Sequence, residues 1–145
     1  MSIHSPALLE KFLETRGYAS RISGDSVVFP LGMGEDSYTV AFAFGGGQLS
    51  ITCQLALLGD FPEERLPSLS LAALDANMQV SPYAFAVIGA AEGEADLEGC
   101  PLVLTDTLPL SDLSEAELDF ALDKLFEAIA LSRDVLQLGL APKGA

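Results

Sequence analysis

Apolar residues recur at helical spacing in three stretches of the chain, residues 5–16, 68–78 and 115–138. The first stretch begins with Ser5 as a possible cap, followed by Pro6, which suits a first helical turn. Before the third stands Ser114-Glu115-Ala116-Glu117, a capping box in which the serine and the glutamate each bond a backbone amide. The pattern therefore predicts three helices, and we expect Gly139 to end the third.

Alternating apolar and polar residues fill most of the sequence between these helices. The alternation is clearest in residues 38–44 and 48–58, which flank the turn Gly45-Gly46-Gly47. Further runs of strand-favouring residues are 18–23, 26–31, 83–90 and 100–108. The order of elements predicts an α+β fold, α-β-β-β-β-α-β-β-α, with a mainly antiparallel sheet packed by helices. Because no linker interrupts it, we expect a single domain over residues 1–145.

The charge balance restricts the partners of such a domain. The 145 residues include 7 Lys+Arg and 21 Asp+Glu, a formal net charge of −14. Nucleic acids and anionic bilayers attract proteins mainly through Lys and Arg, so we expect neither nucleic-acid binding nor membrane insertion. From Leu66 to Asp123 the chain holds eleven acidic residues and no Lys or Arg. This interval predicts a solubilising surface, an acidic face that steers a basic polypeptide segment, or both.

The hydrophobic content indicates an interface. Hydrophobic residues make up 50% of the chain and charged residues only 19%, below the roughly 25% usual for soluble domains. A lone small domain with so little charge would struggle to hide its apolar surface. The start, MSIHSPALLEKF, lacks the basic and long apolar regions of a signal peptide, so we expect a cytoplasmic protein.

The residues for catalysis or metal binding are sparse. His4 is the one histidine, which disfavours Ser-His-Asp, Cys-His and His-based zinc sites. Cys53 and Cys100 lie too far apart for a C-x-x-C motif, so we interpret both as buried or half-buried thiols. The acidic run from Glu92 to Glu98 lacks the glycine and final carboxylate of a calcium loop and is interpreted as a solvated turn. We expect no enzyme activity, cofactor or metal; an enzyme would need a site of carboxylates alone.

Several motifs, in their order and spacing, resemble the class I type III secretion chaperones, the Tir-chaperone family of small, acidic, cytoplasmic homodimers. They are Leu8-Leu9-x-x-Phe12 before Gly17, the strand ending Leu55-Ala56-Leu57-Leu58-Gly59-Asp60, and Leu71-Ala72-Ala73-Leu74-Asp75-Ala76-Asn77. The strand Leu102-Val103-Leu104, followed by an acidic amphipathic helix, completes the resemblance, which spans nearly the whole chain.

The resemblance implies a virulence-associated chaperone without catalysis. Such a protein would bind the N-terminal segment of a secreted effector and keep it soluble and secretion-competent. In that family the second helix and a neighbouring strand build the dimer, which here places Leu71, Leu74 and Met78 at the dimer contact. The first helix and the outer sheet face bind the client, and the corresponding candidates are Leu9, Phe12, Phe29, Phe42 and Phe44. A related fold occurs in the YbjN-like family, so a regulatory or adaptor module that binds a folded protein is the alternative.

Overall fold

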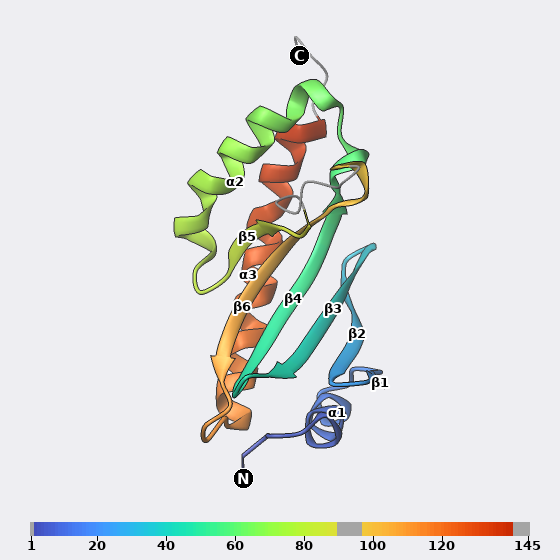
Figure 1. Cartoon of the computed structure of the whole chain (residues 1–145), viewed down its shortest axis with the longest axis vertical. Helices are drawn as coiled ribbons and strands as arrows, with labels where there is room; N and C mark the ends of the chain where they lie inside the picture. Colours follow the sequence, from blue (N-terminus) through green and yellow to red (C-terminus); the bar gives the residue numbers. More distant parts are fainter. Residues whose placement is uncertain (1, 90–96, 141–145) are drawn as a thin grey trace. The chain divides into compact units, whose positions relative to one another are not determined.

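The computed structural model describes residues 2–89 and 97–140, in which three helices accompany one six-stranded sheet (Figure 1). The helices are α1 (Pro6–Thr15), α2 (Leu66–Val80) and α3 (Glu115–Leu140). The strands are β1 (Arg21–Ser23), β2 (Ser26–Met33), β3 (Asp36–Gly45), β4 (Gln48–Leu57), β5 (Ala84–Val87) and β6 (Pro101–Pro109). Short 3-10 turns, η1 (Leu58–Asp60), η2 (Glu63–Arg65) and η4 (Leu97–Gly99), join some of them. The predicted α+β class and element order are confirmed. The acidic run predicted to be a solvated turn lies mostly in residues 90–96, outside the described residues.

The strand order in the sheet is β1-β2-β3-β4-β6-β5. The first four strands are joined as successive antiparallel neighbours, and their register sets Val27, Phe42 and Ile51 side by side. Gly46 and Gly47 form the tight turn between β3 and β4 with φ of +59° and +74°. A two-residue hairpin turn with both φ values positive is strained for any residue with a Cβ, which explains the glycines predicted to form this turn.

The described residues belong to two compact units. Unit 1 is drawn from Met1–Gln54 and Thr105–Leu122, and unit 2 from Leu55–Leu104 and Asp123–Ala145. The boundaries between the units therefore fall within β4, β6 and α3.

The core of unit 1 forms where α1 meets the buried face of the strands. Alternate residues of β2, β3 and β4 are buried, among them Val27, Phe42 and Ile51 at 0% exposure. Tyr18 and Phe42 flank the Phe29 ring, with ring centroids 4.9 and 5.7 Å from it. Apolar side chains repeated every second residue on a strand share one face, so the hydrophobic pattern of the sequence becomes the wall of this core.

A charged contact ties the end of α1 to the first turns of α3 in unit 1. The Arg16 guanidinium donates from Nε and Nη2 to the two carboxylate oxygens of Asp119, each at 2.8 Å, and its Cζ lies 4.5 Å above the Phe12 ring. The hydrogen bonds from Arg16 hold the pKa of Asp119 below its ordinary value. The predicted cap of α3 is present, since the Glu117 amide donates to Ser114 Oγ at 3.1 Å.

The core of unit 2 lies between α2, α3 and the strands. Leu69, Ala73 and Val80 are the buried residues of α2. The prediction that Gly139 ends α3 is wrong, because the helix continues to Leu140. The role of Gly139 is one of space, since a Cβ there would lie 2.7 Å from the Phe61 ring and 3.2 Å from Leu69 Cδ1.

Candidate partner-binding surface

Helix α2 is apolar on two sides. Leu69, Ala73 and Val80 face the core, and Asp75 is the one charged residue among its fifteen. On the other side Leu71, Leu74 and Met78 are 70%, 67% and 89% exposed. We call these three residues the α2 stripe. A helix that is hydrophobic nearly all round is typical of a buried position, so the α2 stripe marks a face that another surface can cover.

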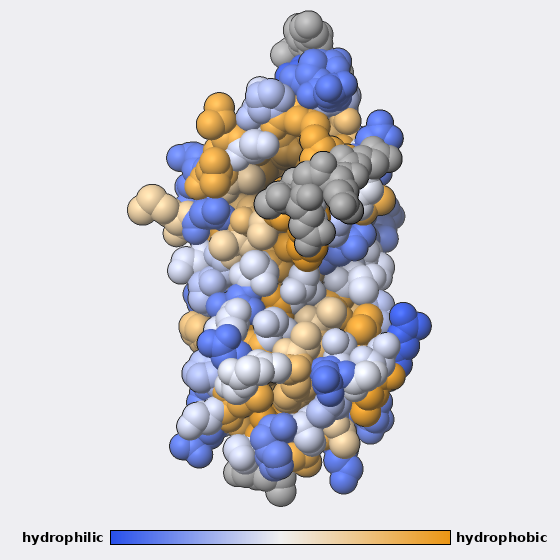
Figure 2. All heavy atoms as spheres, in the orientation of Figure 1, coloured by the Kyte–Doolittle hydropathy of each residue, from blue (hydrophilic) through white to orange (hydrophobic). Residues whose placement is uncertain are grey.

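The α2 stripe consists of the three residues predicted to form a dimer contact. The structure places all three on the surface of one helix at i, i+3 and i+7, the spacing that brings side chains to a common face. Figure 2 shows hydrophobic residues gathered over α2. The dimer itself stays a prediction.

An apolar groove runs beside the α2 stripe in unit 2. It has a volume of about 220 Å³, and we call it the β5 groove. Its lining comes from α2, β5, β6 and η1, namely Leu58, Leu69, Ser70, Ala73, Leu74, Phe85, Ala86, Val87 and Leu102. Leu74 belongs both to the α2 stripe and to this lining. The exposed helix face therefore continues into a concave apolar surface.

Strand β5 forms one edge of the sheet and adds to this surface. Val87 is 39% exposed and Ile88, directly after the strand, 51%. Asn77 holds the strand to the helix, because its side-chain oxygen accepts a 2.7 Å hydrogen bond from the Phe85 amide. The helical pattern of the sequence covers residues 68–78, whereas the helix runs to Val80 and uses the Asn77 side chain to fix the next strand. An apolar edge strand can accept a further strand from a partner.

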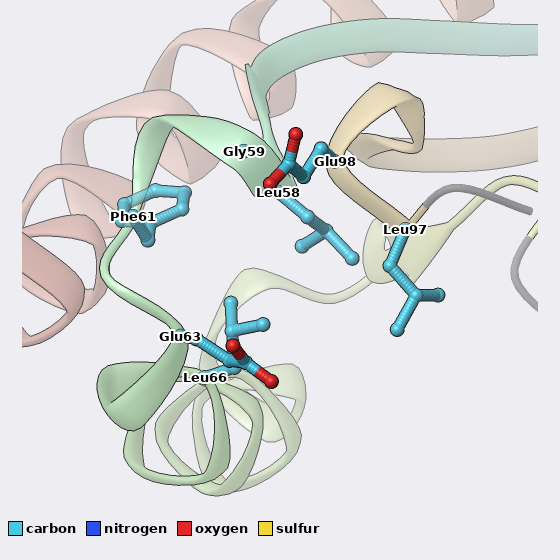
Figure 3. A pocket seen from close by; sticks show the side chains of 7 residues that line it. All are labelled: Leu58, Gly59, Phe61, Glu63, Leu66, Leu97 and Glu98. Carbon is cyan, nitrogen blue, oxygen red and sulfur yellow. The ribbon is translucent and has the colours of Figure 1, made fainter.

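A second concave site in unit 2 lies around the turns η1, η2 and η4. It has a volume of about 350 Å³, and we call it the carboxylate cavity (Figure 3). Its lining residues are Leu58, Gly59, Phe61, Glu63, Leu66, Leu97 and Glu98. No sequence pattern predicted this cavity, because its two walls come from residues 58–66 and 97–98, about thirty positions apart.

A third, smaller groove of about 200 Å³ separates α2 from the C-terminal half of α3, which lie beside each other in Figure 1. Ala72 and Ala76 of α2 leave the space that forms it, and Asp75 and Asp134 contribute carboxylates from the two helices. Two of these three concave surfaces therefore combine apolar walls with carboxylates, whereas the β5 groove is uncharged.

The residues predicted to bind a client lie elsewhere, in unit 1. Leu9, Phe12, Phe29 and Phe42 are buried, with exposures of 0–4%, and Phe44 is half-buried. The first four pack within the core and present no surface to a client. The prediction that these four side chains form an accessible apolar patch is therefore wrong. The alternation showed that the strand residues share a face but could not show which face the core covers.

The outer face of β2, β3 and β4 is accessible and uncharged, and Arg21 of the neighbouring β1 lies opposite Val28 at its edge. The register sets Val28, Ala41 and Thr52 in one row and Ser26, Ala43 and Ser50 in the next. All six side chains are half-buried in unit 1. Small and β-branched residues without charge leave a smooth surface on which an extended chain can lie. This face replaces the buried residues as the candidate client surface of unit 1.

Both cysteines are free and buried, as predicted. Burial raises the pKa of the Cys53 thiol to about 12, so the thiol stays protonated and weakly nucleophilic near neutral pH. Within residues 2–89 and 97–140, no three His, Cys, Asp or Glu side chains are grouped closely enough to hold a metal ion. None of the helices in the described part of the chain is long and apolar enough to cross a membrane.

Comparison with known proteins identifies the fold. No protein-family model and no curated protein matches the sequence. The crystal structure of YbjN from E. coli, a candidate transcription regulator, matches with a TM-score of 0.67 and 9% identity over 90% of each chain. The crystal structure of the ExsC-ExsE complex matches with a TM-score of 0.58 and 15% identity over 100% of each chain. These likenesses confirm the predicted fold, which type III secretion chaperones and YbjN-like proteins share.

Proposed function

We propose that this protein is a non-catalytic, cytoplasmic chaperone of a type III secretion effector. It binds the N-terminal segment of the effector and keeps it soluble and secretion-competent, acting as a homodimer. The observation that carries the proposal is the exposure of the α2 stripe beside an apolar groove and an edge strand. The shared fold with a structure solved as a two-protein complex, ExsC-ExsE, supports it.

In this proposal, separate surfaces bind the second copy of the chain and the client. Two copies would cover each other's α2 stripe, because Leu71, Leu74 and Met78 are the three most exposed large hydrophobic side chains of the described residues and a two-fold contact uses the same patch twice. The client would lie extended on the outer face of β2, β3 and β4 in unit 1. Extended segments gain affinity from main-chain pairing and register from spaced side-chain pockets. The acidic surface would favour a client segment that carries basic residues.

The experiment is capture of the client by tagged, full-length protein from the native lysate, followed by truncation of the captured protein. We expect one dominant partner, retained through a short N-terminal segment, with two copies of this chain per partner. Light scattering of the purified protein should show a dimer at micromolar concentration. A monomer, or a partner held only through a folded domain, would contradict the chaperone proposal.

The alternative function is a regulatory or adaptor module that binds a folded protein. The higher TM-score to YbjN, 0.67 against 0.58 for the ExsC-ExsE structure, favours this candidate. The two functions differ in what the partner contributes. A folded partner should lose binding when it is denatured or cut within its domain, whereas an effector segment should bind as an isolated peptide. The truncation series therefore distinguishes them.

A further inference from the structure

The sulfur-containing side chains of this protein differ widely in exposure. The described residues include Met33, Met78, Cys53 and Cys100. Met78 is 89% exposed, whereas Met33 is half-buried and both cysteines are buried. Burial also raises the pKa of the Cys53 thiol to about 12, so very little of it is present as the reactive thiolate. Of these four side chains, Met78 is therefore the one most open to an oxidant in solution.

The fold holds Met78 on the outside of α2. On the preceding residue, the Asn77 side-chain oxygen accepts a 2.7 Å hydrogen bond from the Phe85 amide, which ties this turn of the helix to β5. Val80, the last residue of α2, is 2% exposed, and its carbonyl oxygen accepts a 2.9 Å hydrogen bond from the Tyr83 amide. Because these contacts fix the inward side of the last turn, rotation of the helix cannot bury the Met78 side chain.

Met78 lies at one end of the α2 stripe, and the other two members cannot compensate for a polar group there. Leu74 and Leu71 lie one and two turns earlier in the helix, and their side chains carry no hydrogen-bond donor. Oxidation of the thioether to a sulfoxide would add a polar S=O group to this face. In a contact that covers the stripe, the new oxygen would lose water and meet aliphatic carbon, and a buried acceptor without a donor is costly.

We infer that Met78 is an oxidation site through which a peroxide controls assembly of the protein. The inference rests on the proposed function, because it concerns the homodimer contact, and it adds the regulation of that contact. The thioether sulfur attacks one oxygen of hydrogen peroxide, the O–O bond breaks and an S=O bond forms. Sulfur is oxidised by two electrons, and the departing hydroxide takes the proton of the transferred oxygen and leaves as water. Methionine sulfoxide reductases reverse this modification, so the effect on assembly would be reversible.

Assembly and oxidation should exclude each other. A dimer that covers the α2 stripe shields Met78 from peroxide, whereas the free chain exposes it. The rate of Met78 oxidation should therefore fall as the protein concentration rises through the dimer dissociation constant. Peroxide would act on chains that have not assembled and would keep them apart.

The test is treatment of the full chain with hydrogen peroxide at millimolar concentration. Peptide mass spectrometry locates the added oxygen, and light scattering over a dilution series gives the dimer dissociation constant before and after treatment. We expect the first oxygen at Met78 and a dimer that is weaker by about tenfold or more, because the sulfoxide is desolvated in both copies. Oxygen found first at Met33 or at a cysteine would overturn the inference, as would an unchanged dissociation constant after complete oxidation of Met78.

Two variants assign the effect to one sulfur atom. Met78→Leu and Met33→Leu are each compared with themselves before and after peroxide, so a different starting affinity does not affect the result. Peroxide should leave the dissociation constant of Met78→Leu unchanged and should weaken the Met33→Leu dimer as it weakens the wild-type dimer. The opposite pattern would contradict the assignment.

Reversal of the modification gives a second readout on the unmodified sequence, which holds even if Met78→Leu misfolds. The oxidised protein is treated with both methionine sulfoxide reductases, one for each sulfoxide epimer. Recovery of the original dissociation constant would support the inference. A dimer that stays weak after mass spectrometry shows that Met78 is reduced again would refute it.

The same dilution series separates this inference from the proposed function. A dimer that forms in the untreated protein and persists when Met78 is fully oxidised would refute the inference and leave the proposed homodimer standing. An untreated chain that is monomeric at micromolar concentration would refute the homodimer itself, and the inference would fall with it.

Discussion

The replacement Leu74→Asp tests the proposed dimer most directly. Full burial of a leucine side chain contributes about 1.5–3 kcal/mol. Leu74 is 67% exposed in the single chain, so docking can bury about two-thirds of that value, roughly 1–2 kcal/mol per copy. A two-fold contact doubles the loss to about 2–4 kcal/mol, which is a 30- to 1,000-fold weaker dimer. Desolvation of the new carboxylate adds to this loss.

The fold of the single chain should survive this change. A surface substitution away from the core changes the free energy of unfolding by about 0.5 kcal/mol or less, and aspartate lowers helix propensity slightly. We therefore expect light scattering to show a monomer at micromolar concentration, with an unchanged circular dichroism spectrum. Met78→Asp, at a residue 89% exposed, should behave in the same way.

The control for this prediction is Ile22→Asp. Ile22 is also an exposed aliphatic residue, at 44%, but it lies on the short strand β1 of unit 1. It should leave the dimer intact. If Leu74→Asp remains dimeric while the protein folds normally, the α2 stripe is not the contact. If both aspartate variants dissociate, the effect comes from added charge and the reasoning from burial is wrong.

Three further predictions concern packing, pH and thiol reactivity. Gly59→Ala should lower the free energy of unfolding by about 1–3 kcal/mol, because the new Cβ would lie 2.9 Å from the Glu98 carbonyl oxygen. Gly45→Ala is the control, since a Cβ at that position has no neighbour within 4 Å, and its melting temperature should stay unchanged in the thermal melts that compare the two variants. Arg16 lowers the pKa of Asp119, so the ion pair should stabilise the fold at neutral pH and lose this effect as the pH falls through the folded-state pKa of Asp119, below 3.8. Urea melts of Asp119→Asn and wild type should therefore differ at neutral pH and converge at that low pH. A difference in stability that persists there would refute the assignment. Cys53, whose pKa is raised to about 12, and the buried Cys100 should resist iodoacetamide at pH 8 until the protein unfolds, and rapid native labelling by mass spectrometry would contradict their burial.

The alternation of apolar residues predicted which side chains share a strand face, but it did not predict which face the core covers. The alternation in β3 and β4 predicted two paired strands, and the register confirms them. It also showed that Phe42 and Phe44 share a strand face, because side chains two positions apart point the same way. It could not show that the core covers this face. Phe42 was therefore expected on a client surface and is instead fully buried.

The same limit applied to α2 with a different outcome. Leucines and alanines occupy both sides of this helix, so its hydrophobic pattern alone left the inward side open. The structure turns Leu69 and Ala73 to the core and leaves the α2 stripe outside. The candidate dimer residues came from a family resemblance, and the structure adds that their side chains are accessible.

By itself, the sequence determined the element order, the hairpin glycines, the cap of α3 and the acidic composition of the protein. These properties depend on neighbouring residues and on composition, so they can be deduced from the sequence without tertiary contacts. Only the tertiary structure decided which apolar faces are buried and brought Glu63 and Glu98 to one cavity. Burial and cavities depend on contacts between residues distant in sequence, such as those between η1 and η4, and no local pattern encodes them.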